Sequence, residues 1–263
     1  MCTSRTHTGP TPAAVAIIGH TGGHSDFRLP DGTDLTGGMA SPYDQPEDEG
    51  LLEEEIRAVV DEARRHGGKP VAAHAQGTAD ILNAIRGGVT SIEHGYGLDE
   101  RALDLAGERG VFVVPTLSAA FTAIDKATMP DYQYQKKTRW SGITRENISR
   151  AIERGARIAL GTDAAIAPHG VNLGELGHLV ELGMDPMAAI VAGTRTSAEL
   201  LVLEDQLGTL TAGRTADLIL CDGDPLTDIG VLGDPANVVC VVQDGVIRKD
   251  LMLPTAPAVR QPR

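Results

Sequence analysis

Aromatic residues are scarce in this sequence. Three phenylalanines, four tyrosines and one tryptophan make up 3% of its 263 residues. The core must therefore be built mainly from alanine, valine, isoleucine and leucine. The hydrophobic fraction of 41% and the charged fraction of 22% are ordinary for a globular protein. This length suits one large domain, or a medium domain with a small appendage.

Cysteines and long apolar runs are also few. The three cysteines, Cys2, Cys221 and Cys240, include no CxxC pair and do not make a disulfide framework. The longest early apolar run, Ala13–Ile18, is too short for the core of a signal peptide or for a membrane span. We therefore expect a cytoplasmic protein with no membrane partner.

Basic residues are outnumbered and scattered. The formal net charge is -13, so the sequence lacks the basic stripe that a nucleic-acid surface requires. The motifs GxSxG, GxxxxGK[ST], GxGxxG and HExxH are absent as well. These absences argue against nucleic acid as a partner and favour a small-molecule substrate handled by other chemistry.

From Leu51 onwards, helical and strand patterns alternate with a repeat of roughly 20 residues, which predicts a parallel sheet. The expected strands cover residues 14–18, 70–74, 89–93, 111–115 and 157–161. The expected helices begin near Leu51, Thr78, Asp99, Thr144, Asn172 and Asp185, and a polar insertion is expected over Ser118–Ser141.

After about Leu207 the pattern changes to β-rich runs. Asp244-Gly245 predicts a hairpin turn between Val238–Val242 and Val246–Arg248. We expect a partial (β/α) barrel over residues 1–207, a small β domain over 208–253 and a loose tail over 254–263. The predicted fold class is α/β, an incomplete TIM-type barrel with a small C-terminal β appendage.

Three polar residues lie at or just past the carboxyl ends of expected strands. His74 and His94 end two neighbouring strands, and Asp163 follows a later one. Active sites of α/β barrels lie at this edge of the sheet. Imidazole and carboxylate groups are the ligands expected for zinc or a similar ion, and three ligands leave a position open for catalysis.

These residues stand in motifs that resemble the metal-dependent amidohydrolase superfamily, most closely its imidazolonepropionase-like and prolidase-like branch. The motifs are VAAHAQG, GVTSIEHG and GTDA, followed by LGTLTAGRTADLILCDGDPL and VVQDGVIRK. The resemblance implies that His74, His94 and Asp163 bind a divalent metal. It also implies that Asp163 handles the proton of the attacking water, and that His169 and Tyr96 lie on the substrate side.

The sequence departs from the family pattern at two positions. The HxH pair of the family's first strand is absent, and none of the five lysines fits the bridging position at the end of its fourth strand. Lys69 comes closest but precedes its strand. Counting strands against the family pattern indicates that the first, second and fourth are missing. The expected cofactor is therefore one divalent ion, zinc, with manganese or iron as alternatives, and His20 or His24 is a further candidate ligand.

Two functions follow from this pattern. The first is a metal-dependent hydrolase that cleaves C–N bonds in an amide, cyclic amide or dipeptide-like substrate through a metal-activated water. The second is a catalytically impaired or inactive truncated relative that only binds a ligand or forms oligomers. An open parallel sheet leaves strand edges exposed, which favours association of this chain into a homo-oligomer.

Overall fold

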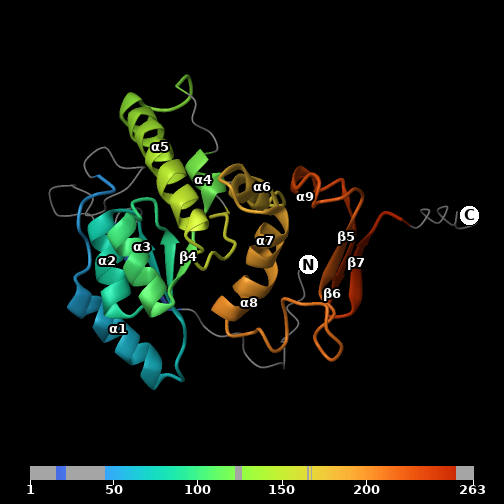
Figure 1. Ribbon diagram of the computed structural model, residues 1–263, viewed down its shortest axis with the longest axis horizontal. Coiled ribbons are helices and arrows are strands. Elements are labelled where there is room, and N and C mark those ends of the chain that lie inside the picture. The colour runs from blue at the N-terminus through green and yellow to red at the C-terminus, as the bar shows by residue number, and fades with distance from the viewer. Residues whose placement is uncertain (1–15, 22–44, 122–125, 165, 167, 253–263) are drawn as a thin grey trace, which may run out of the picture.

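The computed structural model describes residues 16–21, 45–121, 126–164, 166 and 168–252, and for its first strand it describes the backbone alone. Helices connect two separate sheets (Figure 1). The first sheet is parallel, and its strands are adjacent in chain order: β1 (Ala16–Thr21), β2 (Val71–Ala75), β3 (Ser91–His94) and β4 (Phe112–Val114).

Three helices cover one face of this sheet and lie side by side at one end of the molecule (Figure 1). They are the connections between successive strands: α1 (Glu53–Arg65), α2 (Thr78–Gly87) and α3 (Glu100–Arg109). Ala73, Ile92 and Val113 stand in register on the covered face and are buried in the main core. Ile81 and Ile85 of α2 belong to the same core and are fully buried. Crossover helices that bury a parallel sheet in this way are the usual α/β arrangement.

The opposite face of the sheet carries different residues, because side chains alternate along each strand. His74, Glu93 and Val114 stand in register there. Val114 packs with Phe112 and Ala159 in a small separate cluster. Apart from His94 at the end of β3, the helix-covered face is therefore apolar, whereas the second face holds polar residues such as His74 and Glu93.

The predicted strand over 157–161 is wrong in extent. This segment makes only an isolated parallel bridge between Val113 and Ile158, with hydrogen bonds from Val113 N to Arg157 O and from Ala159 N to Val113 O. The next bond of a parallel ladder would run from the amide of residue 115 to Ala159 O, and Pro115 has no N–H to donate, so the pairing ends there. The other strand predictions are confirmed with shifts of one to three residues at their ends.

The predicted insertion over Ser118–Ser141 is also wrong, since much of it is helical. A short helix, α4 (Leu117–Phe121), follows β4, and a long helix, α5, runs over Asp131–Glu153. The buried stripe of α5 contains Lys136, Trp140, Thr144, Ile148 and Ala151. Its spacing is helical, but the lysine and threonine in it conceal the apolar pattern on which the prediction relied.

The helices that follow lie between the two sheets (Figure 1). They are α6 (Gly174–Glu181), α7 (Pro186–Val191), a π-helical turn η1 (Ala192–Thr196), α8 (Ser197–Leu200) and, further on, α9 (Gly230–Gly233). The Asp185 side chain accepts hydrogen bonds from the amides of Met187 and Ala188, and Pro186 is the first helical residue. This confirms the predicted start of that helix.

The second sheet is antiparallel and contains β5 (Leu218–Cys221), β6 (Val238–Gln243) and β7 (Val246–Asp250) in that order. Asp244 and Gly245 both have positive φ, 52° and 71°, which a two-residue type I′ hairpin requires. The predicted hairpin is confirmed. The boundary at residue 207 and the tail after 253 stay predictions, and the tail lies outside the described residues.

The described strands of the parallel sheet do not form a closed barrel. Among the described residues, no helix is long and apolar enough to cross a membrane. The fold observed here is therefore an open α/β sheet with a separate small β-sheet.

Packing between α1 and α2 generates a stability prediction. A Cβ atom on Gly87 would lie 2.4 Å from Ile56 Cγ2, whereas a Cβ on Gly107, exposed on α3, would meet nothing within 4 Å. Gly87→Ala should lower the free energy of unfolding by about 1–3 kcal/mol through overpacking. Gly107→Ala should raise it by about 0.5–1 kcal/mol, because alanine favours the helix interior. Urea unfolding of both variants checks this, and equal effects would contradict the packing described.

Candidate metal centre

Two histidines meet at the carboxyl edge of the parallel sheet. His74 Nδ1 and His94 Nε2 lie 2.9 Å apart, and the ring centroids are 4.3 Å apart in an edge-on arrangement. The parallel register brings the two strand ends together, since Ala75 of β2 is paired with His94 of β3. The left-handed backbone of His94, with φ 72°, takes its side chain out of the alternation that would otherwise place it on the face opposite His74. The structure thus brings together two of the three predicted ligands.

The second ring nitrogen of His94 is held from the neighbouring strand. His94 Nδ1 lies 2.7 Å from Thr116 Oγ1, and the same hydroxyl lies 3.2 Å from the Tyr96 hydroxyl. His94, Tyr96 and Thr116 are all buried, with exposed fractions of 7%, 2% and 4%. A buried imidazole whose rear nitrogen has a fixed partner keeps one orientation, which is how metal-binding histidines are usually held.

Asp163 lies at the same edge but on the surface. Asp163 follows the short segment that pairs with β4, and it is exposed to solvent. Partial burial of its carboxyl group nevertheless raises the pKa of Asp163. Burial is the main cause that raises the pKa of Tyr96, and the negative charges of Asp163 and Glu175 raise that pKa further. Asp163 is therefore within electrostatic reach of Tyr96.

The three strand ends share an uncommon backbone conformation. His94, Thr116 and Asp163 all have positive φ, at 72°, 47° and 53°. Histidine and aspartate adopt the left-handed region more readily than most residues, but a β-branched threonine there is an outlier. Such conformations cost about 1–3 kcal/mol each and occur most often at functional sites. The turns that place these side chains are therefore held under local strain.

The remaining predicted site residues differ in where they lie. His169 is exposed in the turn before α6. The backbone of His20 belongs to β1, but its side chain, like all of His24, lies outside the described residues. Tyr96 lies beside the histidines, with its ring 5.4 Å from that of His94. All of these functional roles stay predictions.

Within the part of the chain that the structure describes, no group of three or more histidine, cysteine, aspartate or glutamate side chains is gathered closely enough to hold a metal ion. The predicted set of His74, His94 and Asp163 is therefore present as a close pair of imidazoles and a separate carboxylate.

Two residues of the site escaped prediction. Thr116 directly follows the expected strand over 111–115, as His94 follows the one over 89–93. This position could have marked Thr116 as a site residue, but threonine is not a residue type that suggests metal binding. Glu175 is completely buried on α6 and accepts hydrogen bonds from Leu117 and Ser118. No sequence pattern marks Glu175 as buried, because a glutamate in the first turn of a helix is ordinarily exposed.

The sheet face that carries His74 also borders a cavity of about 310 Å³. Its wall includes Ala72, Glu93 and Val114 from three adjacent strands. Burial raises the pKa of Glu93, and its carboxyl group accepts a hydrogen bond of 2.7 Å from the Ser91 hydroxyl. Space for a small molecule therefore exists on the face from which His74 projects.

The loops that follow β2 and β3 are fastened to one another at a close approach. Gly97 N donates to Gln76 O, and the Thr78 hydroxyl donates to Gly97 O, each at 2.7 Å. A Cβ on Gly97 would lie 2.8 Å from Gln76 O and 2.9 Å from Thr78 N. Only glycine fits between these two backbones, and its presence keeps the ends of β2 and β3 together.

These features define an α/β protein with a polar site at the carboxyl ends of its parallel strands. The chain belongs to the amidohydrolase family, whose sequence profile matches residues 32–248. The resemblance drawn from the motifs is thereby confirmed.

Individual relatives agree with this assignment. The chain is 34% identical to the ochratoxinase of Aspergillus niger over 218 residues, which cover 81% of this chain and 45% of that protein. A crystal structure of that ochratoxinase superposes with a TM-score of 0.74 at 32% identity, over 83% of this chain and 50% of the other. The chain spans about half the length of the relatives it matches.

Two further solved structures are similar over the same region. One is a Xaa-Pro dipeptidase with bound methionine in the active site, with a TM-score of 0.72 at 38% identity over 77% of this chain and 50% of that one. The other is a prolidase complexed with N-methylphosphonate-L-proline, with a TM-score of 0.73 at 36% identity over 81% of this chain and 53% of that one.

The close approach at Gly97 generates a prediction. Gly97→Ala should destabilise the protein by about 1–3 kcal/mol, because the added methyl group must push apart the two loops beside the histidines. Gly142→Ala is the matched control, since a Cβ at that exposed position of α5 meets nothing within 4 Å. Thermal unfolding distinguishes the two, and an unchanged midpoint for Gly97→Ala would show that the loops are not held as described.

Proposed function

We propose that this chain carries the metal-binding part of a hydrolase that cleaves C–N bonds in amide or peptide-like substrates. The observation that carries the proposal is the convergence of His74 Nδ1 and His94 Nε2 at the carboxyl ends of adjacent parallel strands. We further propose that the open sheet corresponds to part of a TIM-type barrel. The TM-scores of 0.72–0.74 against amidohydrolases at about half their length support this.

The two imidazoles fit an ion such as zinc. Two nitrogens on a tetrahedral zinc ion, each about 2.0–2.1 Å from the metal, lie about 3.4 Å apart. The observed separation of 2.9 Å needs an opening of only a few tenths of an ångström. Thr116 holds the opposite nitrogen of His94, so His94 Nε2 is the nitrogen left to face the ion.

Asp163, at the surface, is the third proposed ligand of the ion. A bound divalent ion would polarise the scissile carbonyl and lower the pKa of water towards about 7. Asp163 would take the proton of the attacking water on a carboxylate oxygen and deliver it to the leaving nitrogen. Tyr96, beside His94, and His169 are proposed on the substrate side.

The proposed substrate class is a small amide, cyclic amide or dipeptide-like molecule. It is supported by the names of the relatives, which include a Xaa-Pro dipeptidase and a prolidase. Of these possibilities, a dipeptide with proline as its second residue is the first to test.

A second candidate function is a non-catalytic relative. It is favoured by the missing HxH pair, by the lack of a lysine at the bridging position and by the absence of a three-ligand group from the described residues. Metal content and turnover separate these two candidates.

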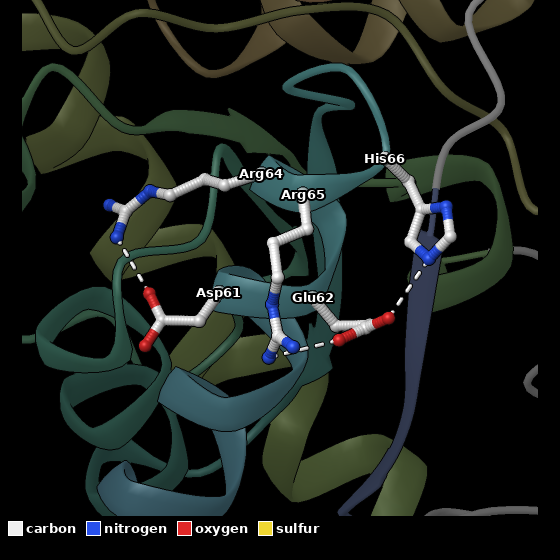
Figure 2. A network of polar contacts seen from close by, with 5 residues as sticks. All are labelled: Asp61, Glu62, Arg64, Arg65 and His66. Atoms are coloured by element: carbon white, nitrogen blue, oxygen red, sulfur yellow. Dashed lines mark hydrogen bonds and ion pairs between the residues drawn. The ribbon is translucent and has the colours of Figure 1, made fainter.

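Metal analysis tests the binding step. Wild-type protein purified with excess Zn²⁺ or Mn²⁺ and then desalted should retain about one ion per chain. His94→Ala should lose it, because one of two converging imidazoles is removed. His66→Ala is the matched control: His66 is exposed at the end of α1, where it contacts Glu62 in a surface network of polar contacts (Figure 2). Metal retained by His94→Ala but lost by His66→Ala would refute the proposed site.

A turnover assay tests the chemistry. Metal-loaded protein should release proline from a Met-Pro dipeptide, and Asp163→Asn should lower kcat by about 10²–10⁴-fold while the ion stays bound. Release of free proline is measured over time. A metal-loaded wild-type protein that cleaves neither dipeptides nor N-acyl amino acids would favour the non-catalytic alternative.

A further inference from the structure

Glu175 is a carboxylate enclosed in the protein. Glu175 is 0% exposed and lies in the first turn of α6. Its oxygens accept three hydrogen bonds: from Leu117 N at 2.5 Å, from Ser118 N at 2.8 Å and from Ser118 Oγ at 2.6 Å. A buried charge is tolerated only where donors compensate it, and these three do so. Glu175 therefore ties α6 to the first residues of α4, more than fifty positions earlier in the chain.

The residue that immediately precedes those two amides is Thr116. It is buried, β-branched and in the left-handed region with φ 47°, a combination that persists only where the surroundings enforce it. The amides of Ala119 and Ala120 hold its carbonyl group. Glu175 holds the next two amides of the chain, Leu117 N and Ser118 N. Hydrogen bonds to the Thr116 carbonyl group and to the amides of the next two residues thus hold Thr116 in its strained conformation.

The side chain of Thr116 faces the histidines. Its hydroxyl lies 2.7 Å from His94 Nδ1 and 3.2 Å from the Tyr96 hydroxyl. If the backbone of Thr116 relaxed towards negative φ, the direction of its Cβ would change and the hydroxyl would leave His94. A continuous path of short contacts therefore runs from Glu175 through the α4 turn and Thr116 to His94 and His74.

We propose that Glu175 is a positioning residue that sets the orientation of the His94 imidazole through the strained turn at Thr116. Its role as an aid to metal binding rests on the function proposed above, whereas the orientation of His94 does not. Glu175 touches neither histidine, so it acts only by holding the turn.

The variants follow from the hydrogen bonds. Glu175→Gln replaces one acceptor oxygen with an amino group that must face a backbone N–H, so the turn loses at least one of its ties. Thr116→Val removes the hydroxyl that meets His94 at nearly constant volume. Ser118→Ala removes one of the three bonds to Glu175 and leaves both amides in place, which makes it the milder variant.

Co²⁺ affinity, read from visible absorption well below the unfolding midpoint, is the main measurement. Glu175→Gln and Thr116→Val should each weaken Co²⁺ binding by about 10–100-fold, the usual effect of losing a residue that orients a metal-binding histidine. The double variant should bind no more weakly than Thr116→Val alone, because both changes break one path. If Glu175 has only a structural role, Glu175→Gln should bind Co²⁺ with wild-type affinity, or the losses of the two single variants should multiply in the double variant. Either result overturns the proposal.

If Glu175→Gln does not fold, Ser118→Ala should still show a smaller loss of Co²⁺ affinity, and an unchanged affinity would overturn the proposal. If the wild-type protein binds no Co²⁺, the proposed function fails. The orientation of His94 is then tested in metal-free protein by ¹⁵N NMR of its ring nitrogens. Glu175→Gln should shift the His94 signals as Thr116→Val does, and unshifted signals would refute the positioning role.

Discussion

Parallel pairing is the constraint on which the site depends. Because β1 to β4 run in one direction, their carboxyl ends meet at one edge of the sheet. The register of β2 on β3 places the strand ends at His74 and His94 side by side, and the left-handed backbone of His94 turns its imidazole to within 2.9 Å of His74 Nδ1. A shift of one residue in this register would turn one histidine to the helix-covered face. The apolar residues on that face, such as Ile92 and Val113, oppose the shift because it would expose them.

The same edge stores conformational strain. Three strand ends leave the sheet through left-handed residues that are not glycine, and each costs about 1–3 kcal/mol. Buried hydrogen bonds offset this cost at Thr116, where Glu175 and two helical amides hold the turn. At the neighbouring loops, the backbone contact between Gly97 and Gln76 keeps the two histidine-bearing strand ends together. The polar site is therefore positioned largely by backbone interactions behind it.

Much of the parallel sheet and of the candidate site could be predicted from the sequence. Short apolar runs that end in His74 and His94 predict buried strands whose carboxyl ends carry the chemistry, and the Asp244-Gly245 pair predicts the hairpin. Other features depend on tertiary contacts that leave no local pattern. The predicted strand over 157–161 is reduced to a single bridge with β4, and α5 buries Lys136 and Thr144 within its apolar stripe. The burial of Glu175 is visible only once α4 and α6 are placed together.

The central claim is that His74 Nδ1 and His94 Nε2 bind one ion between them. X-ray absorption spectroscopy at the zinc edge of the zinc-loaded protein tests this most directly. The account predicts nitrogen ligands about 2.0–2.1 Å from the metal, with the outer-shell scattering of two imidazole rings that falls to one ring in His74→Ala. A spectrum with oxygen ligands and no imidazole scattering would contradict it.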